Sequence, residues 1–357
     1  MKKFLIINPF GIGDVLFTTP VIRSIKENFP KGQVGYWCNE RVGAILEDNP
    51  CIDKVFALSR GDLKRISGYS RIQGLRRSWG LFSAIKKERF DISLDFSLEH
   101  RYSLISKLAG IKRRVGFNYK KRGKFLTESL EVLGYQDKHV VEYYLGLLDF
   151  IGVKPAADLR LELFIAQEAK FKVEALFLDL GINNKGPLIG IAPGAGGSWG
   201  KDAGYKHWSA EKFAQVTDKI SKDFGSKVLI LGDGKERQLA ERIVKASSGK
   251  PFDLTGKISL KELAAVIERL DLLIANDGGP LHMAVALGVK TVSIFGPVDE
   301  RVYGPYPASD RHIVIKKDLD CRPCYQDFRF KGCDNNRLCL EGIDVNEVYE
   351  RARSLML

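Results

Sequence analysis

Long hydrophobic runs are missing from this sequence. No charge-free stretch reaches the roughly 18 apolar residues that a membrane-spanning helix requires, which excludes an integral membrane protein. The N-terminal MKKFLII begins like a signal peptide, but Asn8 and Pro9 end its apolar run after four residues. We therefore expect a cytoplasmic protein.

Two common nucleotide-binding motifs are also missing. The first loop has Gly11 and Gly13, but Leu16 stands where the third glycine of the dinucleotide motif G-x-G-x-x-G would lie. The segment Ala195 to Asp202 approaches a phosphate-binding P-loop, yet Ala195 replaces its first glycine and Asp202 replaces the Ser or Thr that binds magnesium. The sequence therefore supports neither an NAD site nor a kinase-type site.

Basic residues are distributed unevenly along the chain. The formal net charge is +12, and the segment from Arg60 to Lys124 alone has 18 Lys or Arg against five Asp or Glu, a local balance of +13. Such a region favours an anionic partner, such as nucleic acid, an acidic membrane surface, or a phosphorylated or carboxylated substrate, over a merely solvated face.

Length and element pattern predict two domains. The chain has 357 residues, of which 45% are hydrophobic, enough for two ordinary cores. Buried strands alternate with helical segments in both halves, which indicates an α/β fold with mostly parallel sheets. The expected strands are 3–8, 33–37, 54–58, 92–96, 188–192, 227–231, 272–275 and 291–295, and the expected helices are 15–28, one from 42, 101–109, 139–151, 168–180, 208–224, 236–246 and 260–270. We predict two doubly wound, Rossmann-like domains, residues 1–160 and 161–357, facing a central cleft where ligands bind at the carboxyl ends of the strands.

The stretch Asp271 to Pro297 is the most informative in the second half. An apolar strand ends at Asn276-Asp277-Gly278-Gly279, after which Pro280 suits the first turn of a helix and Gly288 the position after its end. Glycines followed by free backbone N–H groups at a helix start favour an anion such as phosphate, with His282 as an added donor. Close packing is the alternative role for these glycines.

Three further loops follow predicted strands. Asp14 lies on the first, where it either caps the helix 15–28 or takes a proton from a bound hydroxyl. The loop 193–201, with four glycines and Ser198, continues to Lys206 and suits a phosphate better than flexibility alone. Glu236 follows the strand 227–231, where it accepts a hydrogen bond from ribose or base, or merely favours the start of a helix.

Four segments occur in one order across nearly the whole chain: IINPFGIGDVLFTTPVIRSIKENFP, KRRVGF, PGAGGSWGKDAGYKHW and NDGGPLHMAVALGVKTVSIFGP. Together they resemble glycosyltransferase family 9, the lipopolysaccharide heptosyltransferases. The resemblance implies a GT-B architecture, with the acceptor on the N-terminal domain and the nucleotide-sugar donor on the C-terminal domain. It also implies inverting transfer of L-glycero-D-manno-heptose from ADP-heptose to the inner core of lipopolysaccharide, with no metal required.

The resemblance also implies roles for individual residues. Asp14 takes the place of the general base, with Gly13 beside it on the acceptor side, and Lys206 is a candidate for stabilising the departing charge together with His282. The residues that fall on the donor side are Ser198, Lys206, Glu236, Asp277, Gly278, Gly279 and His282. Some members of the family have Thr where Gly278 stands, so a hydroxyl contact is not expected here.

The basic region then suits an anionic lipid A-core acceptor and peripheral contact with the acidic surface of the inner membrane. The acceptor-side candidates are Arg101, Lys112, Arg113 and Arg114. Heptosyl transfer predicts no nucleic-acid partner. Two alternatives stay open: a GT-B enzyme with another nucleotide-sugar donor, and a non-enzymatic nucleic-acid-binding protein, which salt-dependent DNA binding would reveal.

Four cysteines near the C-terminus form a separate motif. Cys321, Cys324, Cys333 and Cys339 lie within nineteen residues and open with C-x-x-C, which suits a structural zinc or iron ion. The gaps of eight and five residues are irregular for a zinc finger, so cysteines without a ligand are the alternative. Disulfides are not expected in a reducing cytoplasm.

Overall fold

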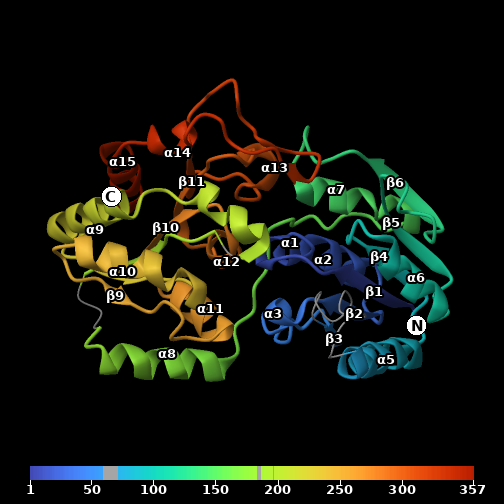
Figure 1. Cartoon of the computed structure of the whole chain (residues 1–357). Coiled ribbons are helices and arrows are strands. Elements are labelled where there is room, and N and C mark those ends of the chain that lie inside the picture. The colour runs from blue at the N-terminus through green and yellow to red at the C-terminus, as the bar shows by residue number, and fades with distance from the viewer. Residues whose placement is uncertain (59–70, 183–185, 196) are drawn as a thin grey trace. The chain divides into compact units, whose positions relative to one another are not determined.

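The computed structural model describes residues 1–58, 71–182, 186–195 and 197–357, with side chains for all of these except 71–76, 197 and 198. The chain forms two compact units, Met1–Phe164 and Ile165–Leu357, where the sequence predicts a boundary after residue 160. Each unit has its own parallel six-stranded sheet with helices packed on it (Figure 1). The expected α/β class with two Rossmann-like units is confirmed.

In the first unit the strand order is β3-β2-β1-β4-β5-β6. The winding direction reverses between β1 and β4, so the loops that follow these two strands diverge and leave room for a ligand at their carboxyl ends. The strands are β1 Lys3–Asn8, β2 Gln33–Cys38, β3 Lys54–Ala57, β4 Ile92–Asp95, β5 Arg113–Tyr119 and β6 Glu128–Val132.

One expected helix of the first unit is divided in two. The sequence predicts a single helix over 15–28, whereas the structure has α1 Ile12–Leu16 and α2 Thr19–Asn28. Pro20 lies in the first turn of α2, and because proline has no N–H it cannot continue the hydrogen-bond ladder of α1. The expected helix 139–151 likewise divides into α7 Val140–Gly146 and the 3-10 helix η1 Asp149–Ile151. The described residues of this unit also form α3 Glu40–Gly43, α5 Arg71–Glu88 and α6 His100–Leu108.

The second unit repeats this winding. Its strand order is β12-β11-β10-β7-β8-β9, so the reversal falls between β7 and β10. The strands are β7 Leu188–Ala192, β8 Lys227–Ile230, β9 Phe252–Asp253, β10 Leu272–Asn276, β11 Lys290–Ile294 and β12 His312–Ile315, with a separate hairpin of β13 Tyr325–Gln326 and β14 Arg329–Phe330.

Six helices of the second unit pack in two groups of three. α9 packs against α10 and α15 around a shared apolar cluster on the sheet, whereas α11 packs against α8 and α12. The helices are α8 Gln167–Asp179, η2 Gly197–Lys206, α9 Ala210–Phe224, η3 Gly234–Glu236, α10 Arg237–Ala246, α11 Leu260–Glu268, α12 Gly279–Ala286, α13 Glu300–Tyr303, α14 Leu338–Glu341 and α15 Val345–Met356.

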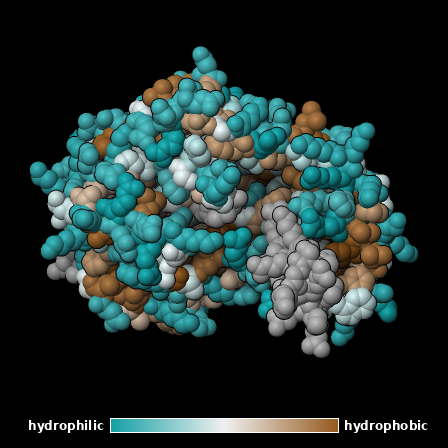
Figure 2. Space-filling view, viewed as in Figure 1, coloured by the Kyte–Doolittle hydropathy of each residue, from teal (hydrophilic) through white to brown (hydrophobic). Residues whose placement is uncertain are grey.

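The surface is largely polar in the view of Figure 2, with hydrophobic residues in separate groups. Among the described residues, no helix is long and apolar enough to cross a membrane. Residues 60–70 of the basic region lie outside the described ranges. The rest of that region extends from α5 through α6 and β5 into the segment that precedes β6.

Candidate active site

Two loops of the second unit meet where its winding reverses. Gly278 directly follows Asp277 and forms the N-cap of α12. A Cβ atom on Gly278 would lie 3.3 Å from the Ala195 Cα atom, so the absence of a side chain allows the loop after β7 to approach closely. The first N–H groups of α12 therefore begin beside this loop, an arrangement that favours anions.

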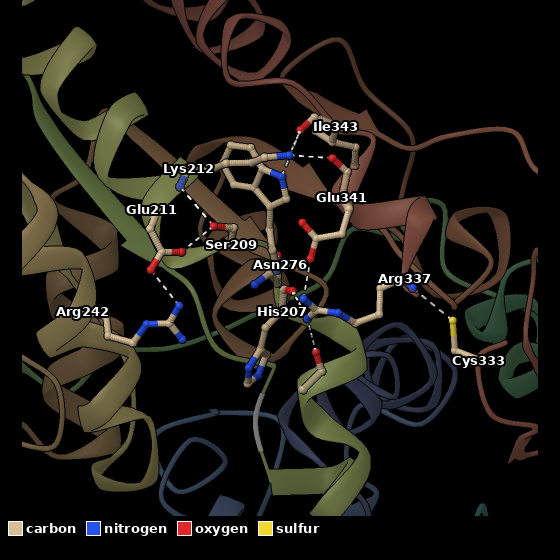
Figure 3. Close-up of polar contacts among 12 residues, drawn as sticks. His207, Ser209, Glu211, Lys212, Arg242, Asn276, Cys333, Arg337, Glu341 and Ile343 are labelled. Carbon is tan, nitrogen blue, oxygen red and sulfur yellow. Dashed lines mark hydrogen bonds and ion pairs between the residues drawn. The ribbon is translucent and has the colours of Figure 1, made fainter. Parts of the chain in front are cut away.

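Asn276 ties both ends of the loop after β7 to β10. Its Nδ2 donates to the Pro193 carbonyl at 2.5 Å. Its Oδ1 accepts from the Trp208 N–H at 3.2 Å (Figure 3). The sequence shows Asn276 only as part of a turn. Its position at the carboxyl end of a strand next to the β7 loop is the signal that points to this role.

A buried ion pair lies between these two anchor points. The Lys206 Nζ atom is 2.6 Å from the Asp277 Oδ2 atom, and each side chain is only 8% exposed. Removing one partner of such a pair leaves the other charge buried without compensation, which typically costs about 3–5 kcal/mol. Asp277 therefore holds the Lys206 ammonium group at a fixed position beside the start of α12.

His282, in the first turns of α12, is also buried. Its Nε2 atom is 4.0 Å from Asp277 Oδ1. Burial lowers the pKa of His282 to about 3, and the positive charge of Lys206 acts in the same direction. The imidazole is therefore neutral at pH 7 and does not add a positive charge to this site.

We expect this histidine to make stability depend on pH. Between about pH 6.5 and pH 3 the unfolded chain binds a proton at His282 whereas the folded chain does not, so the free energy of unfolding falls as the pH is lowered. The contribution of His282 to this change in the free energy of unfolding approaches about 1.4 kcal/mol for each pH unit. Urea denaturation of the wild type and of His282→Gln at pH 7.5, 6 and 5 measures it, and the difference between the two proteins should shrink on acidification.

Other buried groups titrate in the same range, so the comparison must be between the two proteins. The pKa of Asp95 is raised to about 7, which acts in the opposite direction, and burial lowers the pKa of His312 to about 4. The contributions of Asp95 and His312 are the same in the wild type and in His282→Gln, so they cancel when the two free energies of unfolding are subtracted. His100→Gln, at an exposed position at the start of α6, is the control. A constant difference between wild type and His282→Gln at all three pH values would contradict the prediction.

Glu236 occupies a space that two glycines leave open. A Cβ atom on Gly194 would lie 1.6 Å from Glu236 Oε1, and one on Gly232 would lie 2.6 Å from Oε2. The Oε2 atom also accepts a hydrogen bond from the Asp233 N–H at 3.0 Å. This contact lies at the start of a helix, which is one of the two roles that the sequence suggests for Glu236. The carboxylate therefore lies at the carboxyl ends of β7 and β8. The side chain of Ser198 lies outside the described residues.

In the first unit, Asp14 is the third residue of α1, directly after Gly13. Its Oδ2 atom accepts the Gly11 N–H at 3.2 Å, and its carbonyl accepts from Asn8 Nδ2 at 3.0 Å. The capping role is therefore observed, but on the short helix α1 rather than on a helix over 15–28. The side chain is half-buried at the carboxyl end of β1.

Asp95 is a second carboxylate at this end of the sheet, and sequence reasoning missed it. It is the last residue of β4, pairs in register with Ile7 of β1 and is 5% exposed. Burial raises its pKa to about 7, against hydrogen bonds from Ser97 that lower it, including the Ser97 N–H to Oδ1 at 2.9 Å. A carboxylate that ends a buried strand at the point of reversal was the available signal.

The acceptor-side candidates have different surroundings. Lys112 is exposed, and the Arg101 Nε atom pairs with Glu99 at 2.7 Å. Arg113 pairs with Glu128 on β6 at 2.7 Å and donates to the Phe150 carbonyl. Arg114 donates to the backbone carbonyls of Phe125 and Ile111 at 2.6 and 2.5 Å. Arg113 and Arg114 therefore have structural contacts that the sequence did not predict.

The four C-terminal cysteines all have free thiols. The Cys324 thiol donates to the Cys321 carbonyl at 3.0 Å, and the Cys333 sulfur accepts the Arg337 N–H at 3.3 Å. In the part of the chain that the structure describes, no three His, Cys, Asp or Glu side chains are arranged to hold a metal ion. The zinc or iron site that the spacing suggested therefore stays a prediction.

Two Rossmann-like units, each with a reversal of its winding, match the GT-B fold of solved heptosyltransferases. The family model described as glycosyltransferase family 9 (heptosyltransferase) matches residues 78–332, and the chain belongs to this family. The protein is therefore a glycosyltransferase.

Individual relatives agree with this assignment. Lipooligosaccharide heptosyltransferase 2 of Campylobacter jejuni is 27% identical over 363 residues, which cover 100% of this chain and 98% of the relative. The crystal structure of a family 9 glycosyltransferase from Veillonella parvula matches with a TM-score of 0.82 and 24% identity, over 99% of this chain and 97% of that one. The Escherichia coli ADP-heptose lipopolysaccharide heptosyltransferase II matches with a TM-score of 0.76 and 19% identity, over 100% and 98%.

Proposed function

We propose that the protein transfers L-glycero-D-manno-heptose from ADP-heptose to the inner core of lipopolysaccharide, with inversion at the anomeric carbon. Membership of family 9 and the heptosyltransferase names of its relatives support this reaction. The observation that carries the proposal is the buried Lys206 ammonium group, held by Asp277 beside the N-terminus of α12. A cation and free N–H groups at one place suit a diphosphate.

The second unit is the proposed donor domain. The first N–H groups of α12, at Gly278 and Gly279, and the Lys206 ammonium group bind the diphosphate and stabilise the charge that develops on it as ADP departs. Groups of this kind typically contribute about 2.7–4 kcal/mol each to the transition state. His282 supports the site as a neutral group, and Glu236 accepts hydrogen bonds from the nucleoside.

The first unit is the proposed acceptor domain. Asp14 takes the proton of the acceptor hydroxyl as that oxygen attacks the anomeric carbon and the bond to the diphosphate breaks. A direct displacement of this kind inverts the configuration of the anomeric carbon. Asp14 lies at the carboxyl end of β1, next to the point where the winding reverses, which is where ligands of such sheets bind.

The acceptor is anionic and membrane-bound in this proposal. Lys112 and Arg101 bind its carboxylates or phosphates, and the enzyme acts in the cytoplasm at the surface of the inner membrane. The exposed face of α5 suits such a surface, because Trp79 is 70% exposed and packs against Phe82 with tilted rings, while Lys86 lies over the Phe82 ring. Lipid binding that is lost in high salt is the expected behaviour.

Calorimetric titration with ADP-heptose, ADP, UDP-sugars and GDP-sugars tests the donor. Selective binding of the ADP compounds supports heptosyl transfer, and transfer to lipid A-core acceptors is then followed by mass spectrometry. Preference for UDP or GDP compounds would keep the enzyme class and change the donor. Absence of binding to every nucleotide would overturn the proposed donor site.

A further inference from the structure

The segment 321–341 near the C-terminus packs on the loop that carries Lys206. This segment follows β12 and contains the β13–β14 hairpin, the four cysteines and α14. On the hairpin side, the Trp199 ring lies 5.0 Å from the Phe330 ring and 5.2 Å from the Tyr325 ring, between centroids. The Lys206 Nζ atom lies 5.1 Å from the Trp199 centroid, so the aromatic group borders the buried ion pair.

Arg337 makes the second contact of this segment with the loop. Its Nη1 atom donates to the Gly204 carbonyl at 3.0 Å and to the His207 carbonyl at 3.2 Å (Figure 3). These two carbonyls lie on either side of Lys206 in the chain. The guanidinium group therefore fixes the backbone from which the Lys206 side chain extends toward Asp277.

Arg337 is itself held in place by its own segment. Its N–H donates to the Cys333 sulfur at 3.3 Å, and its guanidinium group also pairs with Glu341 one helical turn further on. The loop is thus fixed on one side by Asn276 of β10 and on the other by Arg337 (Figure 3). Neither side chain needs to touch a ligand to set the position of Lys206.

We propose that Arg337 is a positioning residue for the donor site, which holds Lys206 at the diphosphate through the carbonyls of Gly204 and His207. The inference rests on the proposed role of Lys206. Arginine suits this task because its planar group donates several hydrogen bonds in a fixed geometry, whereas a lysine in its place reaches fewer acceptors.

Hydrogen–deuterium exchange of residues 199–208 tests the clamp without any ligand. In Arg337→Met the amides of 204–208 should exchange about tenfold faster than in the wild type, because two charge-assisted hydrogen bonds are lost. Arg242→Met is the matched control, because it removes an exposed ion pair with Glu211 and because Arg242, among the described residues, donates to Glu211 and not to residues 199–208. Unchanged exchange in a folded Arg337→Met protein would overturn the proposal.

Donor binding provides the second measurement. The Kd for ADP and the KM for ADP-heptose should rise about tenfold in Arg337→Met with the acceptor KM unchanged, and Arg337→Lys should recover part of this loss. If Arg337→Met fails to fold, the Arg337→Lys variant decides, since wild-type exchange and ADP affinity in that variant would count against the clamp. Failure of the wild type to bind ADP compounds would overturn the proposed function, whereas the exchange experiment still decides whether Arg337 holds the loop.

Discussion

Asp14→Asn should lower kcat by roughly 10²–10⁴-fold and leave the affinity for ADP-heptose unchanged. The amide cannot take the proton of the acceptor hydroxyl, but its oxygen still accepts the Gly11 N–H, so α1 keeps its capping contact. The loss of a negative charge near the start of a helix costs only about 0.3–1 kcal/mol of stability. Single-turnover transfer with saturating donor, together with calorimetry, measures the two effects separately.

The matched control for this experiment is Asp149→Asn. Asp149 is an exposed aspartate in the first turn of η1, in the same unit, so its replacement removes a charge of the same kind without touching the proposed site. Its activity should equal that of the wild type. A fully active Asp14→Asn enzyme would exclude Asp14 as the base, and loss of donor binding in that variant would point to a structural role instead.

Lys206→Ala should have the largest effect in the second unit. We expect kcat to fall by roughly 10²–10³-fold, because the departing diphosphate loses a buried positive partner. We also expect a loss of about 3–5 kcal/mol in the free energy of unfolding, because Asp277 is left buried without its counter-charge. Steady-state kinetics and urea denaturation measure these effects, with Lys201→Ala, at an exposed position on the same loop, as the control.

A double variant separates the two consequences of losing Lys206. In Lys206→Ala with Asp277→Asn, the uncompensated carboxylate is gone, so most of the lost stability should return while activity stays low. Recovery of activity along with stability would show that Lys206 acts only as the structural partner of Asp277. Additive losses of stability in the double variant would show that the two side chains are not coupled.

The strands and their loops were predictable because local sequence determines them. The bounds of β7, Leu188–Ala192, are those expected, since a buried apolar run before a glycine loop has few other conformations. The glycines around Asp277 similarly predict a turn before a helix. The break between α1 and α2 was also readable in principle, because Pro20 is visible in the sequence and its effect on the ladder is general.

The remaining features depend on contacts between distant residues. Arg337 is 133 residues from Gly204, and nothing in its local sequence points to that carbonyl. The raised pKa of Asp95 comes first from burial, which depends on how the helices close over the sheet. The sequence alone suggests that Arg113 and Arg114 are free to bind a ligand, because their contacts with Glu128 and with the Phe125 carbonyl form only when the chain folds.

The order of synthesis gives the aromatic and Arg337 contacts a further consequence. The ribosome synthesises the chain from its N-terminus, so residues 197–206 are made long before Phe330 and Arg337, which contact them. The Trp208 indole donates to the Ile343 carbonyl at 3.3 Å, and this partner is synthesised later still. Completion of the proposed donor site is thereby one of the last events in the biogenesis of the enzyme. We therefore expect a product truncated before residue 322 to bind the proposed donor more weakly than the full chain, because it lacks the contacts of Phe330 and Arg337 with residues 199–207.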